Sequence, residues 1–294
     1  MPDPVRRRLL MAMALSPLLP VLRSRAASPV DLSRIITIEW LPTELLMALG
    51  VAPMGAAEQH GYRNWVAEPA LPASTVDVGL RTEPNLELMI QMKPSLILCS
   101  SGYGPDLSRI RQIAPTMGFS FSDESGKPLD VTRKSLLRLG EHLNLLPQAQ
   151  AHLAQYDSFI AAAKVRMARR TKRPLLLISV LDSRHTMVFG KGSLFQNVMD
   201  DLGIESAWKG ESSFWGSAVI GIERLIGMTG VDAICFDHGD DAVMQQVEAM
   251  PLWQAMPFVR EKRFHRVPQV WFYGGTLSAM RFCRSLDSVL GTTA

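Results

Sequence analysis

The sequence predicts an α/β protein of two lobes, whose parallel-rich sheets are joined by a single long rigid helix. Short apolar strands alternate with amphipathic helices in both halves of the chain, a pattern typical of parallel sheets. One helix-turn-strand segment occurs twice, at Glu87–Cys99 and Glu223–Cys235, and the two copies align without a gap. Between them, residues 148–170 contain neither glycine nor proline. Such a stretch can form a helix of about 33 Å, a stiff connection between two lobes.

The first lobe is expected to span residues 27–146. Gly50 ends its first helix, and Thr82 or Asn85 can cap its second. The predicted strands are Ile35–Glu39, Pro53–Ala57, Ser95–Ser100 and Gly118–Phe121, and the predicted helices are Thr43–Leu49, Pro84–Met92 and Leu107–Ile113.

From Pro128 to Arg170 the chain has few β-branched residues and reads as helical, with a break at Asn144–Pro147. We expect the linking helix at residues 147–172 and the second lobe at residues 173–294. Strands and helices alternate again in this lobe. The predicted strands are Leu175–Leu181, Thr186–Phe189, Ala233–Asp237 and Phe264–Val267, and the predicted helices are Leu194–Leu202, Ile222–Met228, Ala242–Met250 and Thr276–Leu290.

The first 26 residues have the pattern of an export signal. Arg6-Arg7-Arg8 is followed by an apolar run from Leu9 to Leu22 and then by Ser24-Arg25-Ala26. This order is typical of a cleaved signal peptide, and the apolar run is too short to span a bilayer. The arginine pair favours the twin-arginine route. We therefore expect residues 1–26 to be a twin-arginine-type signal peptide and the mature protein to be soluble in the periplasm.

Charge and cysteine content exclude several functions. The formal charge of +3 becomes −1 without residues 1–26, because that segment carries five arginines and one aspartate. A nucleic-acid or anionic-membrane partner requires a net basic surface, so neither is expected. The three cysteines, Cys99, Cys235 and Cys283, are odd in number and far apart. That spacing favours buried apolar residues over a disulfide framework.

The sequence lacks the usual enzyme signatures. We find no nucleophile elbow, phosphate-binding loop, zinc-protease motif or dinucleotide fingerprint. Asp237-His238-Gly-Asp240-Asp241 is the one dense group of acids and histidine. It could ligate a metal, but a turn leading into an aspartate-rich helix start is the simpler interpretation. We expect no catalytic residues, no metal held by the protein and no cofactor.

Aromatic residues at the ends of the predicted elements are candidates for a ligand cleft. Tryptophan and tyrosine combine a large apolar face with a polar tip, which suits such clefts, although each could instead cover a core beneath a loop. Arg81 precedes the first repeated helix and offers planar donors to a cluster of anionic oxygens. The alternative role for Arg81 is a surface ion pair with Glu83 or Glu87. The aromatic candidates are Trp40, Trp65, Tyr103, Trp215, Trp271 and Tyr273.

Several long segments carry a family resemblance: Glu39-Trp-Leu-Pro-Thr-Glu-Leu-Leu, Asp77-Val-Gly-Leu-Arg-Thr-Glu-Pro-Asn, Ser101-Gly-Tyr-Gly-Pro, Phe214-Trp-Gly-Ser and Val270-Trp-Phe-Tyr-Gly-Gly-Thr. Through them the chain resembles, over nearly its full length, the periplasmic ferric hydroxamate-binding proteins that feed ABC importers in Gram-negative bacteria. The resemblance implies a bilobal fold with a shallow aromatic cleft for the ferric siderophore. It adds no catalytic activity.

The same resemblance implies roles for individual residues. Arg81 and Tyr103 correspond to the donors that bond the iron-coordinating hydroxamate oxygens. Glu87 and Glu223 correspond to carboxylates that dock on arginines of the inner-membrane permease, one from each lobe. The implied aromatic wall is Trp40, Trp65, Trp215, Trp271 and Tyr273, with Ser217 as a polar contact.

The implied partners are a ferric hydroxamate of the ferrichrome, coprogen or aerobactin type and an ABC permease. The protein is expected to be a monomer, and iron is expected to enter only as the siderophore complex. Two alternatives stay open. One is a receptor for another iron chelate, haem or cobalamin, and the other is an exported metal-dependent hydrolase built around Asp237-His238.

Overall fold

A computed structural model of the chain describes residues 30–170, 173–237 and 241–290. The described residues from Asp31 onward form one compact unit. The predicted signal peptide, residues 1–26, lies outside the described residues. Within the described part of the chain, no helix has both the length and the apolar character needed to cross a membrane.

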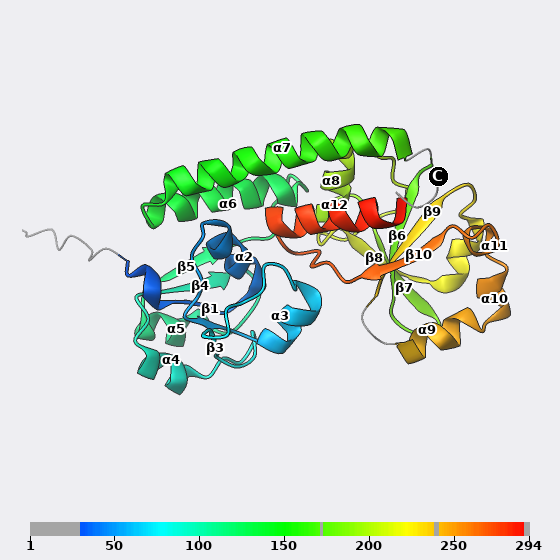
Figure 1. Ribbon diagram of the computed structural model, residues 1–294. Helices are drawn as coiled ribbons and strands as arrows, with labels where there is room; N and C mark the ends of the chain where they lie inside the picture. Colours follow the sequence, from blue (N-terminus) through cyan, green and yellow to red (C-terminus); the bar gives the residue numbers. More distant parts are fainter. Residues whose placement is uncertain (1–29, 171–172, 238–240, 291–294) are drawn as a thin grey trace, which may run out of the picture. The chain divides into compact units, whose positions relative to one another are not determined.

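The first lobe is built on a parallel sheet of five strands in the order β3-β2-β1-β4-β5. Helices α4 and α5 cover one face, where Met89 and Ile110 pack on Ile36 and Ile97 of the strands. Helices α2 and α6 lie on the other side (Figure 1). The elements are η1 (Leu32–Arg34), β1 (Ile35–Thr37), α2 (Trp40–Ala48), β2 (Gly55–Ala56), α3 (Gln59–Trp65), β3 (Val76–Asp77), α4 (Leu86–Met92), β4 (Leu96–Ser100), α5 (Leu107–Ile113), β5 (Thr116–Phe119) and α6 (Pro128–His142).

The second lobe has a mixed sheet in the order β10-β9-β6-β7-β8. Strands β10, β9 and β6 are parallel, as predicted. Strands β7 and β8 are antiparallel to their neighbours, which the sequence did not predict. The elements are β6 (Leu175–Val180), β7 (His185–Phe189), α8 (Leu194–Leu202), β8 (Ser217–Gly221), η2 (Ile222–Gly227), β9 (Asp232–Asp237), α9 (Asp241–Glu248), α10 (Pro251–Gln254), α11 (Pro257–Arg260), β10 (Phe264–Pro268) and α12 (Thr276–Leu290).

One long helix connects the lobes, as predicted. Helix α7 (Leu146–Arg170) has 25 residues, which corresponds to about 37 Å. It packs on α6 of the first lobe and on α8 and α12 of the second (Figure 1). The helix begins one residue before the predicted 147–172, and residues 171 and 172 lie outside the described residues. Near its end, Arg166 Nη2 lies 2.8 Å from Asp287 Oδ2 of α12, which ties the two helices together.

The repeated segment forms a helix, a turn and a buried strand in both lobes. The first copy is α4 followed by β4, and the second is η2 followed by β9. The second helix is a 3₁₀-helix rather than an α-helix. Gly227 occupies the place of Gln91 in the alignment, and glycine is a weak helix former. In both copies the first-turn glutamate is exposed and the cysteine at the strand end is buried.

Candidate functional site

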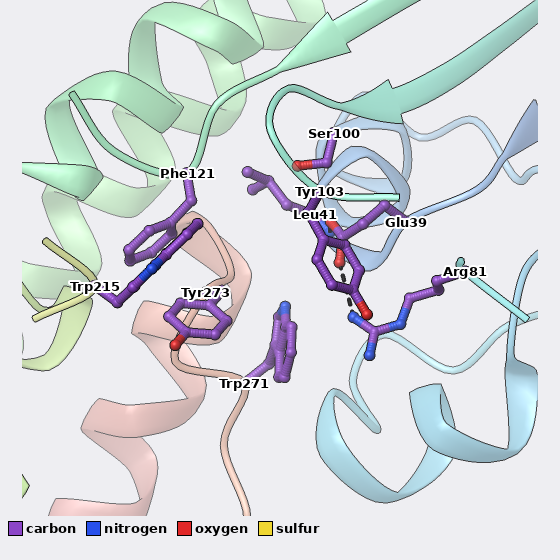
Figure 2. Close-up of a pocket in the computed structure, with 9 residues that line it drawn as sticks. All are labelled: Glu39, Leu41, Arg81, Ser100, Tyr103, Phe121, Trp215, Trp271 and Tyr273. Carbon is purple, nitrogen blue, oxygen red and sulfur yellow. Dashed lines mark hydrogen bonds and ion pairs between the residues drawn. The ribbon is translucent and has the colours of Figure 1, made fainter. Parts of the chain in front are cut away.

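A pocket of about 310 Å³ opens where the strands of the first lobe end. Strands β1, β3, β4 and β5 are parallel, so their carboxyl ends meet at one edge of the sheet, where α/β proteins commonly bind ligands. The residues that follow these strands line one side of the pocket, and loops of the second lobe line the other (Figure 2). The lining residues are Glu39, Leu41, Arg81, Ser100, Tyr103, Phe121, Trp215, Trp271 and Tyr273.

Arg81 is held firmly in the pocket wall. Its Nε donates to Glu58 Oε2 at 3.0 Å, and its Nη1 donates to Glu39 Oε1 at 3.1 Å. The guanidinium lies 3.6 Å from the ring centroid of Trp40, which supports its flat face. Its Nη2 forms no hydrogen bond with the described residues. The arginine therefore keeps a fixed orientation and retains a donor for a ligand.

Aromatic rings form a continuous wall from the arginine to the second lobe. The ring centroid of Trp271 lies 4.7 Å from that of Trp40 and 5.3 Å from that of Tyr273. Tyr273 in turn lies 4.9 Å from Phe121 and 5.4 Å from Trp215. All four contacts are edge-to-face, an arrangement that stabilises aromatic clusters. The wall offers an apolar surface on which ligands of different shapes can pack.

Two further groups in the wall can donate hydrogen bonds. The indole Nε1 of Trp271 is buried and has no hydrogen-bond partner among the described residues. Figure 2 shows this nitrogen at the end of the ring that points into the pocket. Tyr103 is 47% exposed and stands beside Arg81, whose guanidinium carbon lies 5.3 Å from its ring centroid. Buried donors normally have partners, so the Trp271 N–H is suited to a ligand acceptor.

A buried carboxylate fixes the loop that carries Trp271 and Tyr273. Glu44 of α2 accepts hydrogen bonds from the backbone N–H groups of Gly275 and Ser278 at 3.0 and 3.1 Å and from the Ser278 hydroxyl. It thereby caps the start of α12, which follows the loop directly. Burial raises the pKa of Glu44 to about 7, although these hydrogen bonds oppose the shift.

Comparison with known proteins gives the family. The family model described as periplasmic binding protein matches residues 35–270. The chain belongs to the periplasmic binding protein family. Its sequence is 54% identical over 289 residues to the iron(3+)-hydroxamate-binding protein FhuD of Escherichia coli K12, covering 98% of this chain and 97% of that protein.

Solved structures agree with this assignment. The siderophore-binding protein FhuD of Vibrio cholerae, bound to Fe³⁺-Desferal, matches with a TM-score of 0.82 and 26% identity, over 89% of this chain and 98% of that one. The triscatecholate siderophore-binding protein FeuA of Bacillus subtilis matches with a TM-score of 0.70 and 19% identity, over 90% of this chain and 93% of that one. At 19% identity, the similarity to FeuA shows a shared fold and no more.

This periplasmic binding protein brings together most of the residues predicted as ligand contacts. Arg81, Tyr103, Trp215, Trp271 and Tyr273 line the pocket. The predicted alternative for Arg81, an ion pair with Glu83 or Glu87, is wrong, because its carboxylate partners are Glu39 and Glu58.

Three predicted contacts lie outside the lining. Trp40 is 2% exposed and supports Arg81 from behind. The ring centroid of Trp65 lies 5.8 Å from that of Trp271. Trp65 lines two neighbouring cavities, which Asp237 also lines, and not this pocket. Ser217 begins β8 and is not among the lining residues.

Sequence reasoning missed four residues of the lining: Glu39, Leu41, Ser100 and Phe121. All four lie in segments that the sequence analysis named, at Glu39-Trp40-Leu41 and at the ends of the predicted strands 95–100 and 118–121. Each of the four lies at or beyond the end of a strand. Knowing that the strands are parallel neighbours would have indicated them.

Two aspartates of the segment that suggested a metal site form ion pairs with an arginine. Arg266 forms ion pairs with Asp237 and, at 2.8 Å, with Asp241. His238 and Asp240 lie outside the described residues. Among the described residues, no group of three or more His, Cys, Asp or Glu side chains is arranged to hold a metal ion. The three cysteines are buried, as expected, and each is a free thiol in the structure.

Proposed function

We propose that this chain is a periplasmic receptor that captures ferric hydroxamate siderophores in the pocket and delivers them to an inner-membrane ABC permease. The observation that carries the proposal is a single immobilised arginine set in an aromatic wall. The high identity to the FhuD protein of Escherichia coli supports the same ligand class.

The chemistry of the pocket suits a ferric trihydroxamate. Three singly charged hydroxamates balance Fe³⁺, so the complex is neutral, while its coordinating oxygens carry partial negative charge. Arg81 and Tyr103 are the proposed donors to these oxygens, and the Trp271 indole N–H is a third. A hydrogen bond from a charged donor contributes about 1.5–3 kcal/mol, so a few donors suffice for tight binding.

The rest of the pocket accommodates the organic part of the siderophore. Aromatic side chains cover apolar ligand surface without demanding one shape, which fits a receptor for several hydroxamates. The volume of about 310 Å³ lies at the lower end of the range for small-molecule pockets, so part of the ligand would face solvent. Iron stays coordinated by the siderophore, and the protein supplies no metal ligand.

Export and docking complete the proposed function. Residues 1–26 are proposed as a signal peptide of the twin-arginine type that is removed in the periplasm. Glu87 and Glu223 are exposed in the first turns of α4 and η2, equivalent places in the two lobes. They are proposed to contact basic residues of the permease, since two equivalent carboxylates suit a partner with two equivalent halves.

Iron uptake tests this function. Bacterial cells that lack their own hydroxamate-binding protein but keep the permease are supplied with the chain and with radioactive iron as ferrichrome. Restored uptake from ferrichrome, but not from a ferric catecholate, is expected. A chain lacking residues 1–26 is the matched control and should not restore uptake. Failure of the full chain, when immunoblotting finds it in the periplasm, would contradict the proposal.

A further inference from the structure

The repeated segment leaves one large apolar side chain exposed at the same place in each lobe. Ile90 of α4 is 57% exposed and Ile226 of η2 is 43% exposed, and the two residues align in the repeat. The preceding residue of each copy, Met89 or Leu225, is buried in the core, which holds the isoleucine outward. A single exposed isoleucine is ordinary on a soluble protein. Exposure of the same residue type at both equivalent positions indicates a shared role.

Each isoleucine lies beside the glutamate that is proposed to dock on the permease. Ile90 follows Glu87 by three residues, and Ile226 follows Glu223 by three. Residues three apart lie on one face of an α-helix and are eclipsed in a 3₁₀-helix. Each lobe therefore presents an exposed carboxylate and an exposed apolar side chain together, in the same order along the chain.

The patch on the first lobe continues into a shallow hollow. Ile90 lines this hollow together with the partly buried Leu86 and Ile113. Three basic side chains also line it: Arg34, Lys93 and Arg109. An apolar side chain of a partner can enter the hollow beside Ile90, whereas the basic residues at its rim would suit an anionic lipid surface.

The charges of the two patches favour the permease as the partner that covers them. A second copy of this chain, packed patch on patch, would bring identical carboxylates together, which is unfavourable. An anionic lipid surface would be repelled by Glu87 and Glu223, one in each patch. The permease is already proposed to offer a basic residue to each glutamate, so an apolar contact beside each of them continues the same interface.

We propose that Ile90 and Ile226 are equivalent apolar docking residues, each of which packs on an apolar surface of the permease beside the basic residue that receives the neighbouring glutamate. This inference rests on the proposed function, because the partner is the same permease. The glutamates steer and orient the approach of the two proteins. The isoleucines contribute affinity through apolar burial, which salt does not screen.

Binding of the ferrichrome-loaded protein to the permease in lipid nanodiscs tests the proposal. Ile90→Ala and Ile226→Ala each remove a side chain of which roughly half is still available for burial. Each substitution should weaken binding about fivefold, and the double variant should weaken it about 25-fold. Sodium chloride at about 0.5 M should weaken wild-type binding through the glutamates, but it should leave the ratio between wild type and double variant unchanged.

Three controls accompany this measurement. Val165→Ala removes a similarly exposed apolar side chain from α7 and should leave binding to the permease unchanged. All variants should keep the melting temperature and the ferrichrome affinity of the wild type, because the altered side chains are exposed and lie outside the pocket. Nanodiscs of the same anionic lipids without permease should bind none of the proteins.

The outcomes separate this inference from the proposed function. Unchanged permease binding by the double variant, a loss confined to one lobe, or an equal loss in Val165→Ala overturns the inference, while the receptor function stands. Binding to empty nanodiscs that the double variant loses would assign the isoleucines to lipid, and a wild-type dimer in sedimentation that the double variant cannot form would assign them to a second copy. Either result also overturns the inference. If the wild type binds neither ferrichrome nor the permease, the proposed function itself fails.

Discussion

Replacing Arg81 by alanine removes the donor on which ligand binding is proposed to depend. The side chain offers the ligand charge-assisted hydrogen bonds, each worth about 1.5–3 kcal/mol. Losing one such bond should weaken ferrichrome binding about tenfold, and losing two should weaken it about a hundredfold or more. Calorimetric or fluorescence titration of the variant with ferrichrome measures this loss.

The same substitution also affects stability, and the structure indicates how to separate the two effects. Without Arg81, the nearly buried Glu39 loses its ion-pair partner, and breaking a buried pair costs up to about 3–5 kcal/mol. The second partner of Arg81, Glu58, is 31% exposed, so solvent screens part of the interaction. We therefore expect the free energy of unfolding to fall by a smaller amount, about 2 kcal/mol. The double variant Glu39→Gln/Arg81→Ala should recover part of this stability but none of the affinity. An unchanged dissociation constant in a folded Arg81→Ala protein would refute the role of the arginine.

Three more variants probe the aromatic wall, its support and the docking surface. Trp271→Phe keeps a ring but removes the unpaired indole donor, so ferrichrome affinity should fall about three- to tenfold; a titration that shows no change contradicts this donor role. The raised pKa of Glu44 means that the native state binds its proton more tightly than the unfolded state does, so this group makes stability fall as the pH rises from its ordinary pKa of 4.5 to about 7. Glu44→Gln should remove a decline on the order of 3 kcal/mol between pH 5 and pH 8, measured by urea unfolding of both proteins; parallel curves would count against it. Reversing the charges of Glu87 and Glu223 together should leave ferrichrome affinity unchanged and abolish iron uptake, and normal uptake by that double variant would disprove the docking role.

The regular elements could be predicted where local signals were strong. Helices Leu107–Ile113, Leu194–Leu202 and Thr276–Leu290 have the predicted bounds. For the first two, a side-chain cap from Asp106 or Ser193 marks the start. Helix α3 was missed, because its His60-Gly61 and Asn64 are poor helix formers and its N-cap, Glu58, has a positive φ of 53°. Strand β8 was missed because it is a short edge strand that ends at a glycine.

The site was predictable in chemistry but not in geometry. Aromatic residues at loop positions indicated a cleft, yet nothing local distinguishes Trp271, which lines the pocket, from Trp65, which faces neighbouring cavities. The partners of Arg81 come from residues 42 and 23 positions earlier in the chain, so only the order of the parallel strands brings them together. Long-range pairing of this kind leaves no periodic signal in the sequence.

The proposed function depends on the binding of ferric hydroxamates in the pocket. Tryptophan fluorescence of residues 27–294, titrated in parallel with ferrichrome, a ferric catecholate and haem, tests it most directly, because Trp215 and Trp271 line the pocket. We predict saturable quenching by ferrichrome at micromolar concentrations or below, and much weaker responses to the catecholate and to haem. No response to ferrichrome, together with saturable quenching by either of the other two, would contradict the proposed function.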